Sequence, residues 1–368
     1  MIAYLIVVFL FFLLSLIKEN RVFFFFSFLL VYLFLCYGYM CGSDWRIYEE
    51  EYYAHFKMRL VEPGYMMLSN FFADLGVGFW PFHIIFKSFS FFSYYYIFRN
   101  RVSGQGLAFV WMLFLCSFGF YLFIDCPFRN LIAMGIAILA FKFLEQQKYI
   151  LYYGFVILVC SFHLSGSILL VLPIMNFKKM SNKTLYLIYF TFLFLLLVHV
   201  DKLVLKAILA PFPYIYDRIF FYEDTSMFQG SVLSVGLVLR LICLFFMLQY
   251  RNWIHRHYDS SGFVFNMCYA YLLFSLLSYS IPITFRMPFF LAPFYLLMMF
   301  FILQRFSFLN KCVFKVFYLL VAFLITIKTI TERPYYVPYT NIIPYAIEGT
   351  ELDYDYRSNY NFKHSPYK

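Results

Sequence analysis

Apolar runs of membrane length follow one another along almost the whole chain, and this pattern limits the fold more than any other feature. The hydrocarbon core of a bilayer is about 30 Å thick, and a helix of about 20 apolar residues crosses it. Such runs occupy residues 1–17, 22–40, 80–98, 106–124, 128–144, 184–200, 230–249, 262–281, 286–303 and 313–329. Only 13% of the residues are charged, whereas a soluble domain carries about 25%. The chain is therefore predicted to be an all-α, polytopic integral membrane protein.

Polar residues are too few and too scattered along the chain for a sizeable soluble domain. We expect one membrane-embedded domain over residues 1–330 and a polar tail, rich in Tyr and Pro, over residues 331–368. The formal charge of +10 comes mostly from Lys and Arg in short loops, which is typical of orientation by the positive-inside rule. This distribution argues against nucleic-acid binding. The first run has no basic n-region and no small-residue cleavage site, so we expect a retained span.

The apolar run over residues 149–177 is longer than one membrane span requires and shorter than two full spans require. Residues 161–167 interrupt it, and Lys178, Lys179 and Lys183 follow it. A double crossing with His163 at the turn returns these lysines to the basic, cytoplasmic side. The count is then about 10–12 transmembrane helices. The loops 41–79 and 201–229 lie on the outer face, together with the tail.

Polar side chains that a membrane protein normally avoids stand at five separate places, and the span count puts all five on the outer face. They are Asp44, Glu62, Arg129, His163 and Arg286, and Arg46 and Tyr48 lie beside the first of them. This convergence indicates that a polar substrate meets the protein at the outer membrane surface.

Each of these residues also has a structural interpretation. Arginine at the end of a span commonly reaches to the lipid headgroups, which applies to Arg129 and Arg286. His163 could bond a backbone carbonyl, and Glu62 before Pro-Gly could mark a turn. Asp44 could cap the helix that is expected to run through Tyr48.

The functional interpretation assigns complementary chemistry to the same set. Arginine near a low-dielectric boundary binds phosphate or diphosphate bidentately. A carboxylate or a histidine could deprotonate a sugar hydroxyl as a general base, and tyrosines offer flat apolar faces for sugar rings. The eight cysteines include no CxxC pair, which argues against a zinc or redox site. We expect neither a metal nor another cofactor.

Short motifs in this order resemble the EpsG-like branch of the Wzy-type polysaccharide polymerases. They are Gly42-x-Asp44 with Tyr48, Glu62-Pro63-Gly64-Tyr65, Arg129-Asn130-Leu131-Ile132-Ala133, Phe162-His163-Leu164-Ser165-Gly166, and Arg286. The family tends to have Arg-Gln where this chain has Arg129-Asn130. The resemblance covers residues from about 40 to 305.

The resemblance implies a multi-pass protein of the bacterial cytoplasmic (inner) membrane. Such proteins join oligosaccharide repeat units, carried on undecaprenyl diphosphate, into O-antigen, capsule or exopolysaccharide. The lipid diphosphate is the activated donor, so neither metal nor nucleotide is expected. A chain-length regulator and a flippase are expected partners, and membrane lipid surrounds the chain.

The resemblance also implies roles for individual residues. Arg129 and Arg286 would bind the diphosphate and stabilise its departing charge. His163 or Asp44 would orient or deprotonate the acceptor hydroxyl, and Glu62 is a further candidate base; the sequence leaves the choice between His163 and Asp44 open.

Other functions remain as alternatives. An O-antigen ligase or another lipid-carrier-dependent glycosyltransferase uses the same carrier, although a ligase usually has a larger outer loop than residues 201–229. A repeat-unit flippase or transporter is the alternative from another class. Internal repeats are not evident, and we expect no charges buried in mid-span, although both are typical of many transporters.

Overall fold

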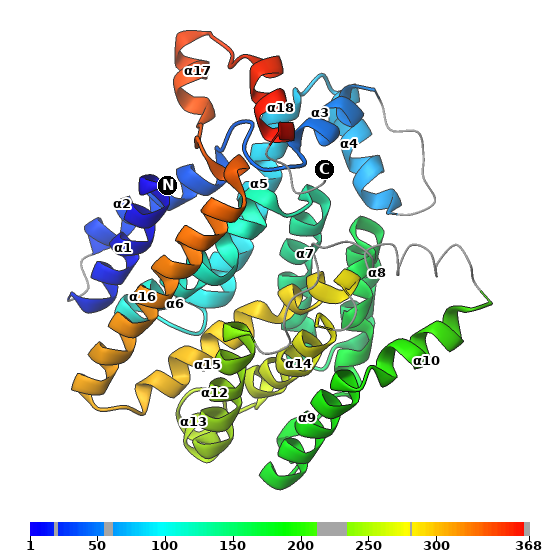
Figure 1. The fold of residues 1–368 in the computed structure, drawn as a ribbon, viewed down its shortest axis with the longest axis vertical. Helices are drawn as coiled ribbons and strands as arrows, with labels where there is room; N and C mark the ends of the chain where they lie inside the picture. The colour runs from blue at the N-terminus through cyan, green and yellow to red at the C-terminus, as the bar shows by residue number, and fades with distance from the viewer. Residues whose placement is uncertain (18–20, 55–61, 212–233, 280–281, 364–368) are drawn as a thin grey trace. The chain divides into compact units, whose positions relative to one another are not determined.

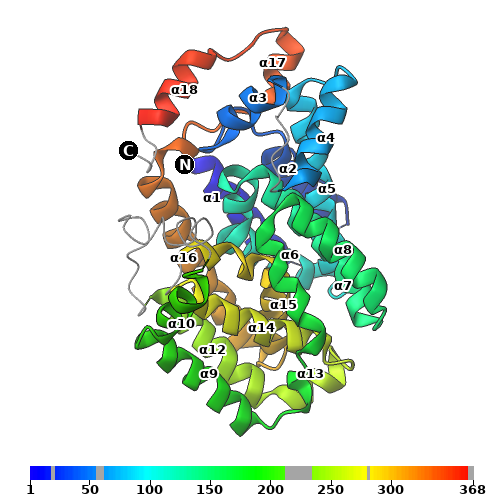
Figure 2. The ribbon, with the colours of Figure 1, turned by 90° about the vertical axis from the view of Figure 1, so that its right-hand side faces the viewer.

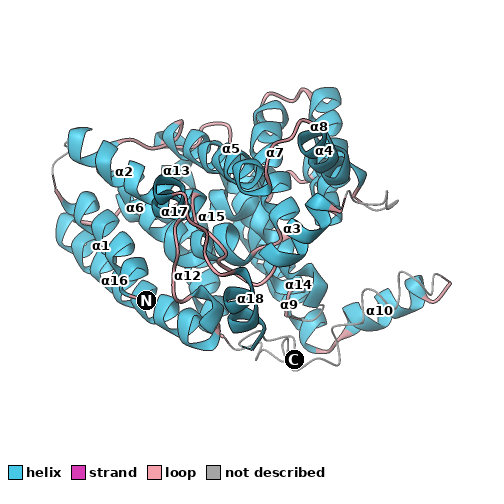
Figure 3. Ribbon diagram, turned by 90° about the horizontal axis from the view of Figure 1, so that it is seen from above, coloured by secondary structure: helices cyan, strands magenta, loops and turns pink. Residues whose placement is uncertain are grey.

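The computed structural model describes residues 1–17, 21–54, 62–211, 234–279 and 282–363. Within these ranges the regular elements are helices (Figure 3), apart from an isolated antiparallel bridge between Gly38 and Asn341. The predicted all-α fold is thereby confirmed for this part of the chain. The chain divides into two compact units, which are Met1–Phe143 with Ile150–Gly166 and Phe306–Lys368, and Leu144–Tyr149 with Ser167–Arg305. They are called unit 1 and unit 2.

Unit 1 contains both ends of the chain. Its elements are α1 (Ile2–Leu16), α2 (Arg21–Cys36), α3 (Trp45–Tyr53), α4 (Pro63–Asp74), α5 (Phe79–Arg99), α6 (Gly104–Phe114), the π-helical turns η1 (Leu115–Gly119) and η2 (Tyr121–Asp125), α7 (Phe128–Glu145), α8 (Tyr149–Phe162), α16 (Phe308–Glu332), η8 (Pro334–Tyr336), α17 (Ile342–Glu348) and α18 (Tyr354–Lys363). The last residues of α7 and the first of α8 belong to unit 2.

The core of unit 1 forms around α6, in which every residue from Leu107 to Phe114 is buried. A helix that is apolar all round belongs in a protein interior, and α1 packs along α6 and α16 (Figure 1). Trp111 of α6 is fully buried, with its ring centroid 5.0 Å from that of Phe91 and 5.3 Å from that of Phe28. Long-range aromatic packing of this kind holds α2, α5 and α6 together.

Unit 2 is built in the same way. Its elements are most of the 3-10 helix η3 (Leu164–Ile174), η4 (Phe177–Lys179), α9 (Asn182–Leu197), α10 (Val200–Leu209), α12 (Val235–Gln249), α13 (Arg251–His257), α14 (Phe263–Leu277), η6 (Pro282–Arg286), η7 (Pro288–Leu291) and α15 (Ala292–Gln304). The core pair is α14 and α15, which are buried over almost their whole length.

Two described helices are long and apolar enough to cross a membrane. They are Thr284–Gln304 and Phe308–Glu332, and a pair bent by 73°, Val235–Gln249 with Arg251–His257, makes a third if it forms one span. Further apolar helices of 10–17 residues include α1, α2 and α9. The helical, membrane-type character of the chain is thus confirmed, whereas the higher span number and the outer position of the loops stay predictions.

The interruption expected in residues 149–177 lies at His163. Helix α8 ends at Phe162, and the 3-10 helix η3 begins at Leu164 and contains Pro173. The double crossing of the membrane itself stays a prediction.

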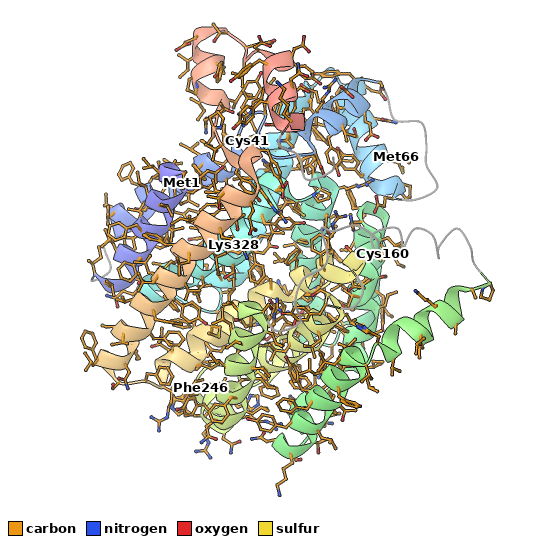
Figure 4. The ribbon with its side chains drawn as sticks, viewed as in Figure 1. Met1, Cys41, Met66, Cys160, Phe246 and Lys328 are labelled. Carbon is orange, nitrogen blue, oxygen red and sulfur yellow. The ribbon has the colours of Figure 1, made fainter. Side chains whose placement is uncertain are left out.

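The C-terminal segment packs onto the loop that leads from α2 to α3. Helices α17 and α18 lie beside α3 (Figure 2), and Cys41 of the loop is close to the segment that carries them (Figure 4). Arg357 of α18 is 1% exposed and donates from Nε to the Met40 carbonyl (2.9 Å) and from Nη2 to the Pro338 carbonyl (2.8 Å). The segment predicted as a polar tail is therefore an integral part of unit 1.

Candidate functional site

The centre of the candidate site is an ion pair between Glu62 and Arg129. Glu62 precedes α4 as its N-cap residue, and Arg129 is the second residue of α7. Their Oε2 and Nη1 atoms are 2.7 Å apart, and the Glu62 side chain is 7% exposed and that of Arg129 31% exposed. A carboxylate is rarely buried without a charged partner. The Arg129 guanidinium is thus the partly exposed member of the pair, and the Glu62 carboxylate is the buried one.

The backbone at Glu62 adopts the left-handed conformation, with φ 64° and ψ 50°. A side chain other than glycine is uncommon there, and such strain concentrates at functional sites. Pro63 follows at the first helical position, which suits proline because its missing N–H needs no partner there. The Leu164 amide also donates to Glu62 Oε1, at 3.2 Å. The carboxylate is thus held from both α7 and the segment after α8.

His163 is the third member of this group. Its Nε2 lies 3.9 Å from Glu62 Oε1, and its Nδ1 lies 2.6 Å from Ser165 Oγ. The Ser165 amide donates to the same Nδ1 at 3.2 Å. Since Nδ1 accepts this bond, the neutral imidazole carries its proton on Nε2, which faces Glu62. The ring is buried, with 7% exposure.

Close approach between α4 and α8 brings these groups together. A Cβ on Gly64 would lie 2.3 Å from Ser161 Oγ and 3.1 Å from the Ser161 carbonyl oxygen. Glycine is therefore required for the start of α4 to contact the end of α8, two residues before His163. In the Glu62-Pro63-Gly64 motif, Pro63 therefore begins α4 and Gly64 allows α4 to contact α8.

Aromatic rings form one wall of the group. Tyr48 of α3 packs edge-on against Tyr65 (5.6 Å) and Phe128 (6.3 Å). Tyr48 is 7% exposed, and its burial raises the pKa of its phenol, an effect that the positive charge of Arg129 opposes. Tyr48 is therefore near enough to Arg129 for the guanidinium charge to act on its hydroxyl.

Asp44 belongs to a neighbouring hydrogen-bonded group. It occupies the N-cap position of α3, as expected, but its side chain makes no capping bond. Instead Ser43 Oγ contacts Asp44 Oδ1 (2.8 Å) and Asp125 Oδ1 (2.9 Å). Asp125 Oδ2 accepts from Arg333 Nη1 (2.6 Å) and from the Tyr335 hydroxyl (3.0 Å). Residues from three separate parts of unit 1 therefore meet here.

A small cavity of about 20 Å³ lies beside the Asp44 group, and Asp44, Tyr48, Asp125 and Phe128 are among its lining residues. Its lining also includes His83 and Lys87 of α5, which are 7% and 5% exposed. Neither residue was selected from the sequence, and the buried Lys87 shows that the expected absence of mid-span charges is wrong for the run 80–98. A lysine in the middle of the run 80–98, one helical turn after a histidine, is the signal that could have identified them.

Arg46 and Arg286 lie outside both groups. The Arg46 side chain is 47% exposed, and its Nε lies 2.6 Å from Glu50 Oε1; a nitrogen of its guanidinium also donates to Ser358 Oγ. Arg286 is in η6 of unit 2, with its guanidinium carbon 5.1 Å from the ring centre of Phe285. The joint action of Arg129 and Arg286 on one diphosphate stays a prediction.

Among the described residues no cluster of three or more His, Cys, Asp and Glu side chains could hold a metal ion. Ser43, Asp125, Arg333 and Tyr335 are members of the Asp44 group that sequence reasoning missed. Asp125 stands in the same short turn as Arg129, which was a usable signal. Arg333 is 208 positions from Asp125, and no local pattern relates the two.

Comparison with characterised proteins and with solved structures finds no match. A family model described as the EpsG family matches residues 21–347. The matched range contains Asp44, Glu62, Arg129, His163 and Arg286, and it ends before α18. The resemblance found in the sequence motifs is confirmed. The chain belongs to the EpsG family and is a membrane protein of polysaccharide biosynthesis.

Proposed function

We propose that this chain polymerises undecaprenyl-diphosphate-linked oligosaccharide repeat units into O-antigen, capsule or exopolysaccharide. The reaction is a glycosyl transfer at the outer face of the bacterial cytoplasmic membrane, which the chain crosses many times. The observation that carries the proposal is the meeting of Glu62, Arg129 and His163 in unit 1. They come from three separate parts of a chain that belongs to a polysaccharide family.

Arg129 is the proposed binding residue for the diphosphate. Its guanidinium is the more exposed half of the ion pair, and its buried Nε has no acceptor among the described residues. A diphosphate offers two oxygens to the planar guanidinium, whereas a single carboxylate oxygen contacts it now. Diphosphate binding would therefore draw Arg129 away from Glu62. Arg286, Arg46 and Tyr48 are proposed as further substrate-binding residues.

The release of Glu62 would supply the base for the transfer. The acceptor hydroxyl oxygen attacks the anomeric carbon of the donor, and the bond from that carbon to the diphosphate oxygen breaks. The bonding electron pair leaves with the diphosphate, whose charge Arg129 stabilises. The hydroxyl proton passes to Glu62 or His163, whose Oε1 and Nε2 atoms are 3.9 Å apart. Asp44 is the third candidate, and it lies in the neighbouring group.

A polysaccharide gel tests this function. The gene is deleted from its host and complemented with wild type, Arg129→Ala, Arg129→Lys or Arg99→Ala. Arg99 is exposed at the end of α5 and is the matched control. We expect single repeat units from the deletion and from both Arg129 variants, because lysine lacks the bidentate fork. Wild type and Arg99→Ala should restore the ladder of chain lengths. A full ladder from Arg129→Lys would remove Arg129 from this role.

The same experiment distinguishes the alternatives. Complete loss of surface glycan, with lipid-linked units retained inside the membrane, would indicate a flippase. Full-length polymer that is not attached to its final acceptor would indicate a ligase. The proposed partners, a chain-length regulator and a flippase, are tested by co-purification with the complemented wild-type protein.

A further inference from the structure

Unit 2 contains an arginine inside a predicted membrane span. Arg240 lies in the second turn of α12, within the apolar run 230–249, and its side chain is partly buried. Its Nη1 donates to the Tyr279 hydroxyl at 2.6 Å, and its guanidinium carbon lies 5.7 Å from the ring centre of Tyr279 and 5.8 Å from that of Tyr271. These phenols attract the cation, but they are neutral and do not cancel its charge. A charged side chain within a span points to a functional site.

The carboxylates of unit 2 lie at the far end of α14 from Arg240. Among the side chains that the structure describes in this unit, they are Glu145 and Asp259. Both contact Ser261 Oγ at 3.4 Å, just before α14 begins. Tyr279, which binds Arg240, follows the end of α14. This helix of 15 residues is about 22 Å long, so neither described carboxylate compensates the guanidinium charge.

Two hydroxyl groups beside Arg240 carry one hydrogen more than they use. Ser234 Oγ and the Tyr279 hydroxyl are 2.9 Å apart, so one of their two hydrogens lies between them. The Tyr279 oxygen also accepts from Arg240, and Ser234 Oγ accepts from the Leu237 amide at 3.2 Å. The second hydroxyl hydrogen has no acceptor among the described residues. The group therefore combines a positive charge with an available donor, which is the chemistry that binds an anion.

A glycine leaves space at the point where these groups meet. A Cβ on Gly236 would lie 3.6 Å from Arg240 Nη1 and 3.6 Å from Ser234 Oγ. It would lie 3.7 Å from the Tyr279 hydroxyl. All three are ordinary contact distances, so a ligand atom in the place of this Cβ contacts the guanidinium and both hydroxyl groups.

We propose that Arg240, Tyr279 and Ser234 form a second anion site, which binds the diphosphate of a lipid-linked repeat unit. This inference rests on the proposed function and deepens it. Both repeat units in the proposed transfer carry a lipid diphosphate, and the site at Arg129 accounts for the one that departs. The site at Arg240 binds the other. On the predicted topology, α12 follows the outer loop 201–229, so its start faces the side on which the transfer is proposed.

Binding of farnesyl diphosphate, a short lipid diphosphate, tests the site without polymerase activity. The probe is titrated onto the purified full-length chain in phosphatidylcholine nanodiscs. Wild type should bind two equivalents, and Arg129→Ala and Arg240→Gln should each weaken one of them by about 10- to 100-fold. The matched control is Arg305→Gln, which should leave both equivalents unchanged. Arg305 is exposed at the end of α15 and also faces a tyrosine, with its guanidinium carbon 5.9 Å from the ring centre of Tyr250.

A second variant keeps the arginine and fills the space beside it. Alanine favours a helix over glycine, and the new methyl group of Gly236→Ala would meet no atom closer than 3.6 Å. We therefore expect a Tm equal to or above that of wild type. The same methyl group occupies the place of the ligand atom, so one equivalent should bind about three- to tenfold more weakly. This variant stays informative if Arg240→Gln does not fold.

Binding by Arg240→Gln or by Gly236→Ala that equals wild-type binding would overturn the proposal and leave Arg240 as a structural partner of two tyrosines. Competition by inorganic pyrophosphate for the equivalent that depends on Arg240 would support recognition of the diphosphate itself. Competition by phosphatidylglycerol, added to the nanodiscs, would assign the site to membrane lipid and refute the proposal. An equivalent lost in Arg240→Gln but none in Arg129→Ala would instead refute the role proposed for Arg129 and leave the second site standing.

Discussion

The Glu62–Arg129 ion pair gives the sharpest prediction, and a double-mutant cycle tests it. At a separation of 2.7 Å and an effective dielectric constant of about 20, the Coulomb attraction is about 6 kcal/mol. Desolvation offsets much of this attraction, and breaking a buried pair by removing one partner costs about 3–5 kcal/mol. Arg129 is 31% exposed and is partly screened by water, so we take the lower end, about 3 kcal/mol.

The two single variants should differ in stability. Arg129→Gln leaves the carboxylate of Glu62, 7% exposed, without its cation, whereas Glu62→Gln leaves a guanidinium that can reach water. We expect losses of about 3 kcal/mol for Arg129→Gln and about 1 kcal/mol for Glu62→Gln. The double variant should be less destabilised than the sum, with a coupling free energy of about 2 kcal/mol.

The assay is thermal unfolding of the purified protein in lipid nanodiscs, where the Arg129→Gln loss corresponds to a Tm lower by about 6–12 °C. The matched control is the Arg46–Glu50 pair of α3, whose side chains are 47% and 54% exposed. Exposed pairs contribute about 0–1 kcal/mol, so its cycle should show little coupling. Additive losses for Glu62 and Arg129, within about 0.5 kcal/mol, would refute the reasoning.

Three further predictions concern the loop before α3 and the residues around it. Burial raises the pKa of the Glu49 carboxyl from its ordinary value of 4.5 to about 7. The contribution of this group to stability is therefore complete below pH 4.5 and is lost as the pH rises through 7. Glu49→Gln should make Tm depend less on pH in this range, and an unchanged slope would contradict the prediction. Arg357→Met should lower the unfolding free energy by about 2 kcal/mol, because the Met40 carbonyl loses the closer of its two donors and the Pro338 carbonyl loses the donor from Arg357. Equal Tm values for variant and wild type would show that Arg357 does not anchor the loop. Gly42→Ala should abolish the polymer ladder and lower Tm, because its Cβ would lie 1.9 Å from the Ile124 carbonyl oxygen. Gly76→Ala is the control: Gly76 also has a positive φ, but its Cβ would meet no atom within 4 Å. A similar loss in both variants would show that backbone strain, and not the clash, causes the effect.

Local features were predictable because they depend on neighbours in the sequence. Runs of Phe, Leu and Ile predicted the helices, and the polar interruption at His163 predicted the end of α8. The Glu62-Pro63-Gly64 motif indicated a chain turn, and the structure places it at the start of α4. Arg129, at the start of an apolar run, is found in the first turn of α7.

Partnerships between distant residues were not predictable in the same way. Asp44 was selected from the sequence, but its connection through Ser43 to Asp125 spans 82 positions. Lys87 was hidden in an apolar run, and its position beside the cavity depends on how α5 packs. Composition described residues 331–368 as a polar tail, although Arg357 within them is 1% exposed.

The helical, membrane-type fold, the family, and the residue types available for the chemistry could be predicted without a structure. These properties follow from hydrophobic length and from short motifs, which act within one or two turns of chain. The pairing of Glu62 with Arg129, and the serine that contacts both Asp44 and Asp125, depend on tertiary packing. A buried charge or hydrogen-bonding group is stable only with a partner, and packing can supply that partner from any position along the chain.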